Sequence, residues 1–115
     1  MSERNLAWRY RRKTVMKMVN VIFVKIYITE SSKMLNTIVS YLKNDAKIRG
    51  ISVFRAISGF GDKGDHIASL VDLSLDLPLS IEFFDSKEKV EPALEYLSSI
   101  IKHKHIVFWD AKAND

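Results

Sequence analysis

The order in which strand-like and helix-like segments alternate constrains the fold of this chain more than any other feature. Residues 19–29 are rich in β-branched side chains and place apolar residues at alternate positions, which predicts a strand with a buried face. Residues 34–42 instead repeat apolar side chains at helical spacing. The whole order is strand, helix, strand, strand, helix, strand, over residues 19–29, 34–42, 51–57, 79–84, 90–101 and 106–109.

This order predicts an α+β fold of the ferredoxin-like βαββαβ type, an antiparallel four-stranded sheet with two helices on one face. At 115 residues the chain is expected to form one such domain, over residues 19–115. The second face of the first strand carries Phe23 and Tyr27, and an apolar sheet face is poorly suited to open water. We therefore expect that face to meet another subunit, in preference to the alternative of a ligand.

Local signals predict where the helices begin and end. Ser31 or Ser32 is a suitable N-cap for the first helix, and Gly50 stands where its C-terminal turn should lie. Pro92 disturbs the second helix, because proline has no N–H for the backbone hydrogen bond. Either the first turn of that helix is loose, or the helix begins near Glu91.

The positive charge of the chain is concentrated at its N-terminus. Residues 1–18 hold six basic residues and one acidic residue, a net charge of +5, whereas the remaining 97 residues carry 12 basic and 13 acidic side chains. Residues 1–18 are therefore expected to be a disordered basic extension or a segment upstream of the true start, although such a tail can also bind nucleic acid. The chain lacks a secretory signal and a membrane-spanning stretch, so we expect a cytoplasmic protein.

A glycine cluster follows the second predicted strand. Gly59, Gly61 and Gly64 fall within six positions, and Lys63 stands among them. Glycine permits close backbone approach, so such a loop can bind an anion through its N–H groups and the neighbouring cation. The alternative is a mobile turn that needs glycine only for its geometry. Neither a P-loop nor a dinucleotide-binding fingerprint is present. After the glycine cluster, the spacing of Ile67, Leu70 and Val71 is compatible with a short helix.

Other kinds of chemistry have little support in the sequence. The absence of cysteine excludes a disulfide scaffold, a thiol nucleophile and a thiolate zinc site. The three histidines are His66, His103 and His105, but Lys102 and Lys104 adjoin the last two and would repel a divalent cation. No nucleophile can be paired with a base. We therefore expect neither a metal site nor an enzyme.

An RNA-binding module is the main alternative, because the RRM fold has the same order of elements. Such modules stack bases on aromatic side chains of the first and third strands, and the basic tail would add phosphate contacts. The corresponding aromatic residues here are Phe23, Tyr27, Phe83 and Phe84. Against this alternative, the Gly-Phe-Gly tripeptide at residues 59–61 ends the second strand instead of lying within the third.

Several motifs in the same order give the chain a specific resemblance to a known family. They are Ser52-Val53-Phe54-Arg55, Gly59-Phe60-Gly61, His66, Ser74-Leu75-Asp76-Leu77-Pro78-Leu79-Ser80-Ile81-Glu82, and Asp85 at the start of the second helix. On these motifs the chain resembles, over residues 22–110, the PII-like proteins of the family of domain of unknown function 190. That family resembles PII signal-transduction proteins, which are trimers of ferredoxin-like subunits. They bind adenine nucleotides in clefts between subunits and contact partner proteins through a long loop after the second strand.

The resemblance implies a trimeric, non-enzymatic regulator that binds a small anionic effector, with an adenine nucleotide as the first candidate. Residues 59–78 occupy the place of the loop that would contact a partner protein. Arg55 is the expected bidentate ligand of the anion because its planar fork matches phosphate or carboxylate; the alternative is an ion pair between Arg55 and Glu82. The residues expected to hold the effector are Arg55, Gly59, Phe60, Gly61, Lys63, Gly64, Lys102 and Lys104.

The chain departs from the PII pattern at two places. Only Asp62 separates Gly61 from the Lys63-Gly64 pair, so the Arg-Gln dipeptide of PII proteins, whose glutamine contacts ligand, is missing. The glycine-rich phosphate loop before the last strand is replaced by residues 98–105, which contain lysine and histidine instead. The resemblance therefore does not extend to a specificity for ATP.

Overall fold

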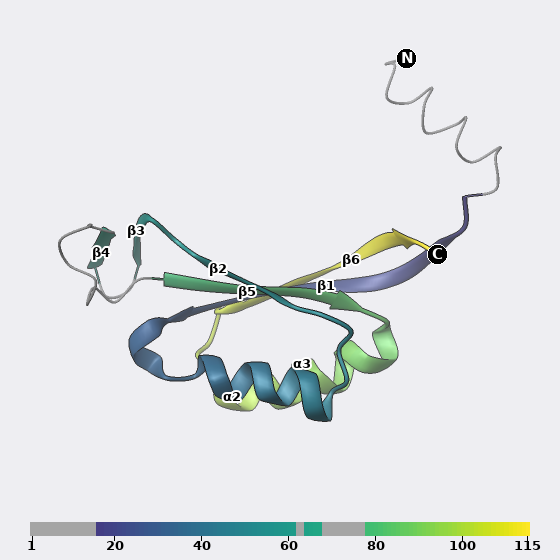
Figure 1. The fold of residues 1–115 in the computed structure, drawn as a ribbon, viewed down its shortest axis with the longest axis horizontal. Coiled ribbons are helices and arrows are strands. Elements are labelled where there is room, and N and C mark those ends of the chain that lie inside the picture. Colours follow the sequence, from purple (N-terminus) through teal and green to yellow (C-terminus); the bar gives the residue numbers. More distant parts are fainter. Residues whose placement is uncertain (1–15, 62–63, 68–77) are drawn as a thin grey trace, which may run out of the picture.

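The computed structural model describes residues 16–61, 64–67 and 78–115, and its centre is a four-stranded antiparallel sheet (Figure 1). The strands lie in the order β2-β5-β1-β6, so β1 and β5 are central and β2 and β6 form the edges. Their bounds are β1 Met18–Thr29, β2 Ser52–Arg55, β5 Pro78–Asp85 and β6 Ile106–Asn114. With one helix between β1 and β2 and another between β5 and β6, this arrangement confirms the predicted ferredoxin-like fold.

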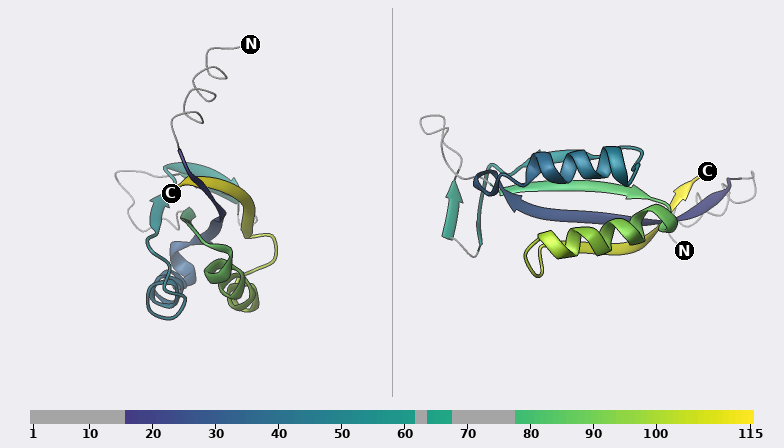
Figure 2. Two further views of the ribbon diagram at one scale, coloured as in Figure 1. Left: turned by 90° about the vertical axis from the view of Figure 1, so that its right-hand side faces the viewer. Right: turned by 90° about the horizontal axis from the view of Figure 1, so that it is seen from below.

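Two helices form one layer that covers one face of the sheet. After a short 3-10 turn, η1 (Glu30–Ser32), the first helix consists of α2 (Leu35–Ser40) followed by a π-helical turn, η2 (Tyr41–Asp45). The second helix is α3 (Lys87–Ile100). Figure 2 shows both helices on the same face, with α2 nearer β2 and α3 nearer β6. The Tyr41 and Tyr96 rings stack at a centroid distance of 4.1 Å and join the two helices. Within the described ranges, no helix is long and apolar enough to cross a membrane.

The ends of the first helix differ from the prediction. Ser31 and Ser32 lie in η1, where the Ser32 hydroxyl donates to the Thr29 carbonyl at 2.7 Å, and the residue before the helix is Met34, without a side-chain cap. The predicted position of the cap is therefore wrong, because the helix begins after Met34; Ser32 lies two residues before Met34, and its hydroxyl also accepts the Met34 N–H at 3.3 Å. The chain leaves the helix at Lys47, which has a left-handed φ of 59°, and not at Gly50.

The second helix begins earlier than Glu91, which was one of the two predicted alternatives. The helix begins at Lys87, and Pro92 lies inside it, so a start near Glu91 is wrong. The first turn is closed by the Val90 N–H, which donates to the Ser86 carbonyl at 3.0 Å. Proline removes only one backbone donor, and burial of the apolar stripe of the helix outweighs that loss. The fully buried members of the stripe are Val90, Ala93 and Leu97.

The glycine cluster forms a small hairpin of its own. Strands β3 (Ser58–Gly61) and β4 (Gly64–Ile67) pair antiparallel, with Gly61 opposite Gly64. Ile67 therefore belongs to a strand and not to the predicted short helix, whose other residues, Leu70 and Val71, lie outside the described residues.

The core lies between the sheet and the helices. Alternate residues of β1 and β5 point toward the helical layer, which matches the period of two in the sequence. The buried core residues are Ile22, Val24, Ile26, Ile28, Ile38, Leu42, Ile48, Leu79, Ile81, Phe83, Val90, Ala93 and Leu97. Phe83 belongs to this set and is 3% exposed, so it is not available to stack on a base as the RNA alternative required.

The opposite face of the sheet, which we call the open face, has no helix on it and is aromatic. Phe23 stacks on Trp109 at a centroid distance of 4.8 Å and on Phe84 at 6.2 Å, which links β6, β1 and β5. Beyond Phe84, Phe54 of the edge strand β2 is 52% exposed. On the same face Lys25 stands opposite Glu82, with the Lys25 ammonium 3.6 Å from the Glu82 carboxylate. At the edge of this face the Arg49 guanidinium lies 5.7 Å from the centroid of the Phe84 ring. Among the described residues the open face is thus an apolar surface with a central pair of opposite charges and one further cation at its edge.

Candidate functional site

The candidate site lies at one end of the sheet. The antiparallel register places the last residues of β1 and β2 beside the first residues of β5, with Thr29 opposite Pro78 and Arg55 opposite Leu79. β6 begins near the same end, because Ile106 stands opposite Ile26. The 3-10 turn η1, the glycine hairpin and the turn between α3 and β6 therefore all emerge at this end (Figure 1).

Arg55 is paired with Glu30 and not with Glu82. Its guanidinium contacts the carboxylate of Glu30, which opens η1, and its side chain is 63% exposed. The predicted alternative of an ion pair with Glu82 is wrong for a geometric reason. Arg55 is registered with the buried Leu79 and so belongs to the helix-covered side of the sheet, whereas Glu82 faces Lys25 on the open face.

Arg55 and Glu30 border a hollow of about 600 Å³ between η1, the start of α2 and the β2 edge. Its polar lining also includes Lys33 and Asn36, and its apolar lining consists of Leu35, Val53 and Leu79. Lys33 has a left-handed φ of 58°, and its N–H donates to the Glu30 carbonyl at 3.3 Å. Sequence reasoning missed Glu30, Lys33 and Asn36, because that stretch was interpreted only as a helix cap.

The glycines of the candidate site lie next to Arg55 along the chain. Gly59, Phe60 and Gly61 belong to β3, and Gly64 begins β4. The hairpin leaves the sheet just after Ala56, whose N–H donates to the Pro78 carbonyl at 2.9 Å. The predicted contribution of Lys63 falls outside the described residues.

The two lysines from the other predicted part of the site are at the same end of the sheet but at its opposite edge. Lys102 and Lys104 lie in the turn that leads into β6, where Lys104 has a left-handed φ of 63°. The backbone of this turn is held by the Tyr27 N–H, which donates to the His105 carbonyl at 2.8 Å. Two strands separate β6 from β2, which corresponds to roughly 14 Å at ordinary strand spacing. One chain therefore does not bring these lysines to Arg55.

The histidines do not form a recognisable metal centre in the part of the chain that the structure describes. His103 and His105 share one turn, where His105 Nδ1 is 2.8 Å from the His103 carbonyl oxygen. A group of three or more metal-ligating side chains is not found among the described residues. His66 lies in β4, away from that turn along the chain.

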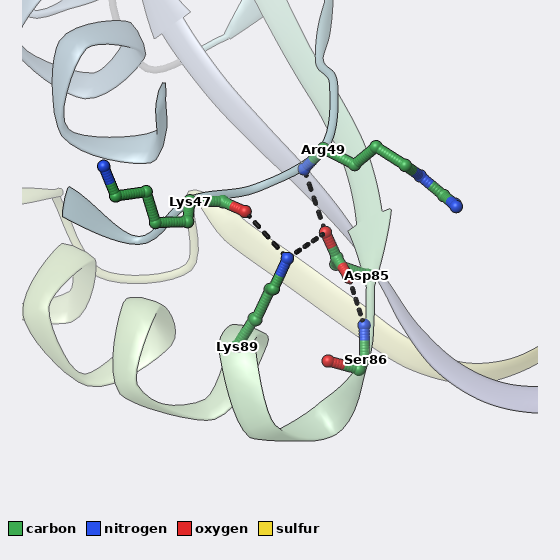
Figure 3. A network of polar contacts seen from close by, with 5 residues as sticks. All are labelled: Lys47, Arg49, Asp85, Ser86 and Lys89. Atoms are coloured by element: carbon green, nitrogen blue, oxygen red, sulfur yellow. Dashed lines mark hydrogen bonds and ion pairs between the residues drawn. The ribbon is translucent and has the colours of Figure 1, made fainter. Parts of the chain in front are cut away.

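A polar network at the far end of the sheet has a structural role (Figure 3). The Asp85 carboxylate accepts hydrogen bonds from the Arg49 N–H at 2.9 Å and the Ser86 N–H at 2.8 Å. Lys89 lies 3.9 Å from the same carboxylate and donates to the Lys47 carbonyl at 3.0 Å. Burial alone would raise the pKa of Asp85, but these hydrogen bonds and the charges of Lys89 and Arg49 outweigh it and lower the pKa. The network ties the segment before β2 to the start of α3.

Comparisons with known proteins agree with this fold. UPF0166 protein MJ1524 of Methanocaldococcus jannaschii is 30% identical over 95 residues, covering 78% of this chain and 87% of that protein. CPII, a nitrogen regulatory PII-like protein from Thiomonas intermedia K12 whose structure contains ADP, AMP and bicarbonate, has a TM-score of 0.65 at 18% identity over 88% of this chain and 92% of CPII. A candidate PII-like signaling protein from Thermus thermophilus has a TM-score of 0.60 at 16% identity, over 87% of this chain and 93% of that chain.

At these identities the solved structures establish the PII-like fold. The family assignment rests on a match to a family model, described as an uncharacterised ACR, that spans residues 21–113 and so runs from within β1 to within β6. The predicted resemblance covered residues 22–110, almost the same stretch. The chain belongs to the DUF190 family.

Proposed function

We propose that this chain is a non-enzymatic PII-like regulatory protein that binds a small anionic effector in clefts between subunits and signals through residues 59–78. The observation that carries the proposal is the placement of the two cationic sets. Arg55 and Lys102 with Lys104 lie at one end of the sheet but on opposite edges. A second copy that places its β6 edge beside the β2 edge of the first would complete a site that one chain leaves divided.

The open face supports assembly. Phe54, Phe84 and Trp109 are each more than a third exposed there, and aromatic surface of this kind usually meets a partner. Its central charges, Lys25 and Glu82, cancel within the face, and Arg49, over the Phe84 ring, leaves one cation at its edge. A mainly apolar face with a single remaining cation suits a second copy of the same chain, whereas an RNA-binding face would need a larger excess of positive charge for the phosphates. We therefore propose a trimer through this face, as in PII proteins, in preference to the RNA-binding alternative.

An oxyanion is the ligand chemistry that the residues at this end favour. Arg55 offers a planar set of donors for phosphate or carboxylate, and the backbone of the glycine hairpin can approach a ligand closely. CPII, which has the same fold, was crystallised with ADP, AMP and bicarbonate, and in another structure with ADP, AMP and acetate. We propose an adenine nucleotide as the first effector to test here, with small carboxylates and bicarbonate as the second group.

The assembly and the ligand can be tested together. Native mass spectrometry of the mildly purified protein should show three subunits and any retained ligand. Phe23→Asp, which places a charge at the centre of the aromatic stack, should dissociate the trimer in light scattering. A wild-type protein that remains monomeric across micromolar concentrations would contradict both the trimer and the intersubunit site.

The binding residues can be tested by calorimetry with ADP, AMP and bicarbonate. Arg55→Ala and Lys63→Ala should each weaken binding by roughly 1.5–3 kcal/mol, about ten- to a hundred-fold, because each removes a charge-assisted contact. Lys43→Ala, a change of the same kind on the exposed surface of η2, is the matched control and should have no effect. If neither Arg55→Ala nor Lys63→Ala weakens a ligand that binds, the site lies elsewhere. Tight single-stranded RNA binding lost in Phe23→Ala and Tyr27→Ala would instead support the RNA-binding module.

A further inference from the structure

We infer that Glu30 is an internal competitor of the effector: its carboxylate occupies Arg55 in the unliganded chain, and an incoming oxyanion must displace it into the hollow beside η1. The inference rests on the proposed function, because it takes Arg55 as an effector-binding residue. It adds a regulatory carboxylate to the site and makes the hollow the position that the displaced Glu30 side chain would occupy.

The geometry of the pair is that of an exchangeable contact. Glu30 is the first residue of η1 and Arg55 is the last residue of β2, so the pair connects two segments at the base of the glycine hairpin. The Glu30 Oε1 atom contacts the guanidinium, is shielded from solvent, and has no partner other than Arg55 among the described residues. The Arg55 side chain is nevertheless 63% exposed. A ligand can therefore reach the guanidinium from solvent while Glu30 is still in place.

Arginine is suited to such an exchange. Its guanidinium carries five N–H donors in a rigid fork, and one carboxylate satisfies at most two of them. An oxyanion that makes two aligned hydrogen bonds to the Arg55 guanidinium can therefore replace the ion pair between Arg55 and Glu30. This recognition requires a carboxylate or phosphate group, and it does not distinguish a nucleotide from a small free anion.

The hollow provides a second position for negative charge. Lys33 and Asn36 line it together with Glu30 and Arg55, so it contains two cations, one amide and one carboxylate. Its volume of about 600 Å³ leaves room for the Glu30 side chain to move away from Arg55. Lys33 lies three residues after Glu30, at the end of the same turn, so its positive charge would stabilise the displaced carboxylate.

The size of the competition follows from the exposure of the pair. Ion pairs with an exposed partner contribute little, and the usual range corresponds to a factor of about two to five in an equilibrium constant. Glu30→Gln should therefore tighten binding of an oxyanion about two- to five-fold. The glutamine keeps the size of the side chain and removes only its charge.

The experiment is calorimetry on the full chain with three probes: ADP, inorganic phosphate and acetate. Wild type, Glu30→Gln, Arg55→Ala and the double variant Glu30→Gln/Arg55→Ala are compared. Glu82→Gln is the matched control, because it makes the same charge change in an ion pair on the opposite face of the sheet. ADP binding without phosphate or acetate binding identifies a nucleotide site, whereas binding of all three identifies a general oxyanion site.

The outcomes separate this inference from the proposed function. Tighter binding by Glu30→Gln, unchanged binding by Glu82→Gln, and loss of the gain in the Arg55→Ala background support the competitor. Binding by Glu30→Gln alone, with none by wild type, supports it too. If Arg55→Ala weakens binding but Glu30→Gln does not strengthen it, the competitor is refuted and the proposed site stands. If Arg55→Ala has no effect, or if no variant binds any of the three probes, both the competitor role of Glu30 and the proposed effector site are refuted.

Discussion

Replacing Asp85 by alanine should remove the polar network that ties the segment before β2 to α3. The carboxylate accepts the Arg49 and Ser86 N–H groups and lies near the Lys89 ammonium, and only 12% of the side chain is exposed. Alanine removes the acceptor and leaves two backbone donors without it.

The expected loss of stability follows from the two hydrogen bonds. A hydrogen bond to a charged acceptor contributes about 1.5–3 kcal/mol, but the exposed Arg49 N–H will find water after the substitution. Most of the loss should therefore come from the partly buried Ser86 N–H, so we expect about 2 kcal/mol in total. For a domain of this size, that corresponds to a decrease in Tm of about 8–16 °C.

The pH dependence of this effect has a definite sign. The pKa of Asp85 is lowered from its ordinary value of 3.8, so folding favours the ionised form. The stabilisation is complete well above pH 3.8 and is lost as the pH falls through the lowered pKa of the folded state. The difference in stability between wild type and Asp85→Ala should therefore be greatest near neutral pH and should narrow in acid.

Thermal unfolding followed by circular dichroism, at one fixed protein concentration, measures both effects. Asp85→Asn keeps an oxygen acceptor but loses the charge and should lie between wild type and Asp85→Ala. Asp110→Ala is the control, because Asp110 is exposed on β6. A Tm for Asp85→Ala within about 2 °C of wild type at pH 7, or a difference that grows in acid, would refute the reasoning.

Three further predictions concern other parts of the chain. Removal of residues 1–15 should leave the Tm nearly unchanged, since β1 begins at Met18; failure of that shortened chain to fold would show that the basic extension packs on the domain. Leu97→Ala should lower the free energy of unfolding by about 2–5 kcal/mol in denaturant titration, because Leu97 is 0% exposed in the core; a loss under about 1 kcal/mol would contradict its place there. The pKa of Tyr41 is raised above 10.0, chiefly by burial and then by the charge of Asp45, so the ultraviolet titration of wild type minus that of Tyr41→Phe should show a tyrosine ionising above pH 10; ionisation below it would contradict this.

The central elements of the fold could be predicted because their side chains alternate or repeat with a clear period. Leu79, Ile81 and Phe83 point inward from β5 as the alternation indicated, and Ile38 and Leu42 face the sheet from the first helix. The helix ends could not be predicted in the same way. Ser32 has good capping chemistry, and its hydroxyl accepts the Met34 N–H, but the 3-10 turn that contains it places the start of the helix beyond Met34. Lys47 takes the left-handed position that glycine would favour.

Less of the candidate site than of the fold could be predicted from the sequence. Arg55 and the glycines could be named because they are close together along the chain, and they are indeed neighbours at one end of the sheet. The partner of Arg55 could not be named, because pairing depends on which side of the sheet each residue takes. Glu82 is only three residues from Leu79 in sequence, yet it lies on the other face, whereas Glu30 is 25 residues from Arg55 and touches it.

The edge strand β6 has a consequence for the solubility of the newly synthesised chain. Nine residues, Ile106–Asn114, form an edge with unpaired backbone groups along one side of the described sheet, and Val107, Phe108 and Trp109 are exposed on it. Such an edge is a template for adding strands of other chains, which leads to aggregation. The charges of Asp110 and Lys112 interrupt the apolar run, as gatekeeper residues do. A newly synthesised chain can therefore aggregate through this edge, and its soluble yield should increase when it is produced slowly.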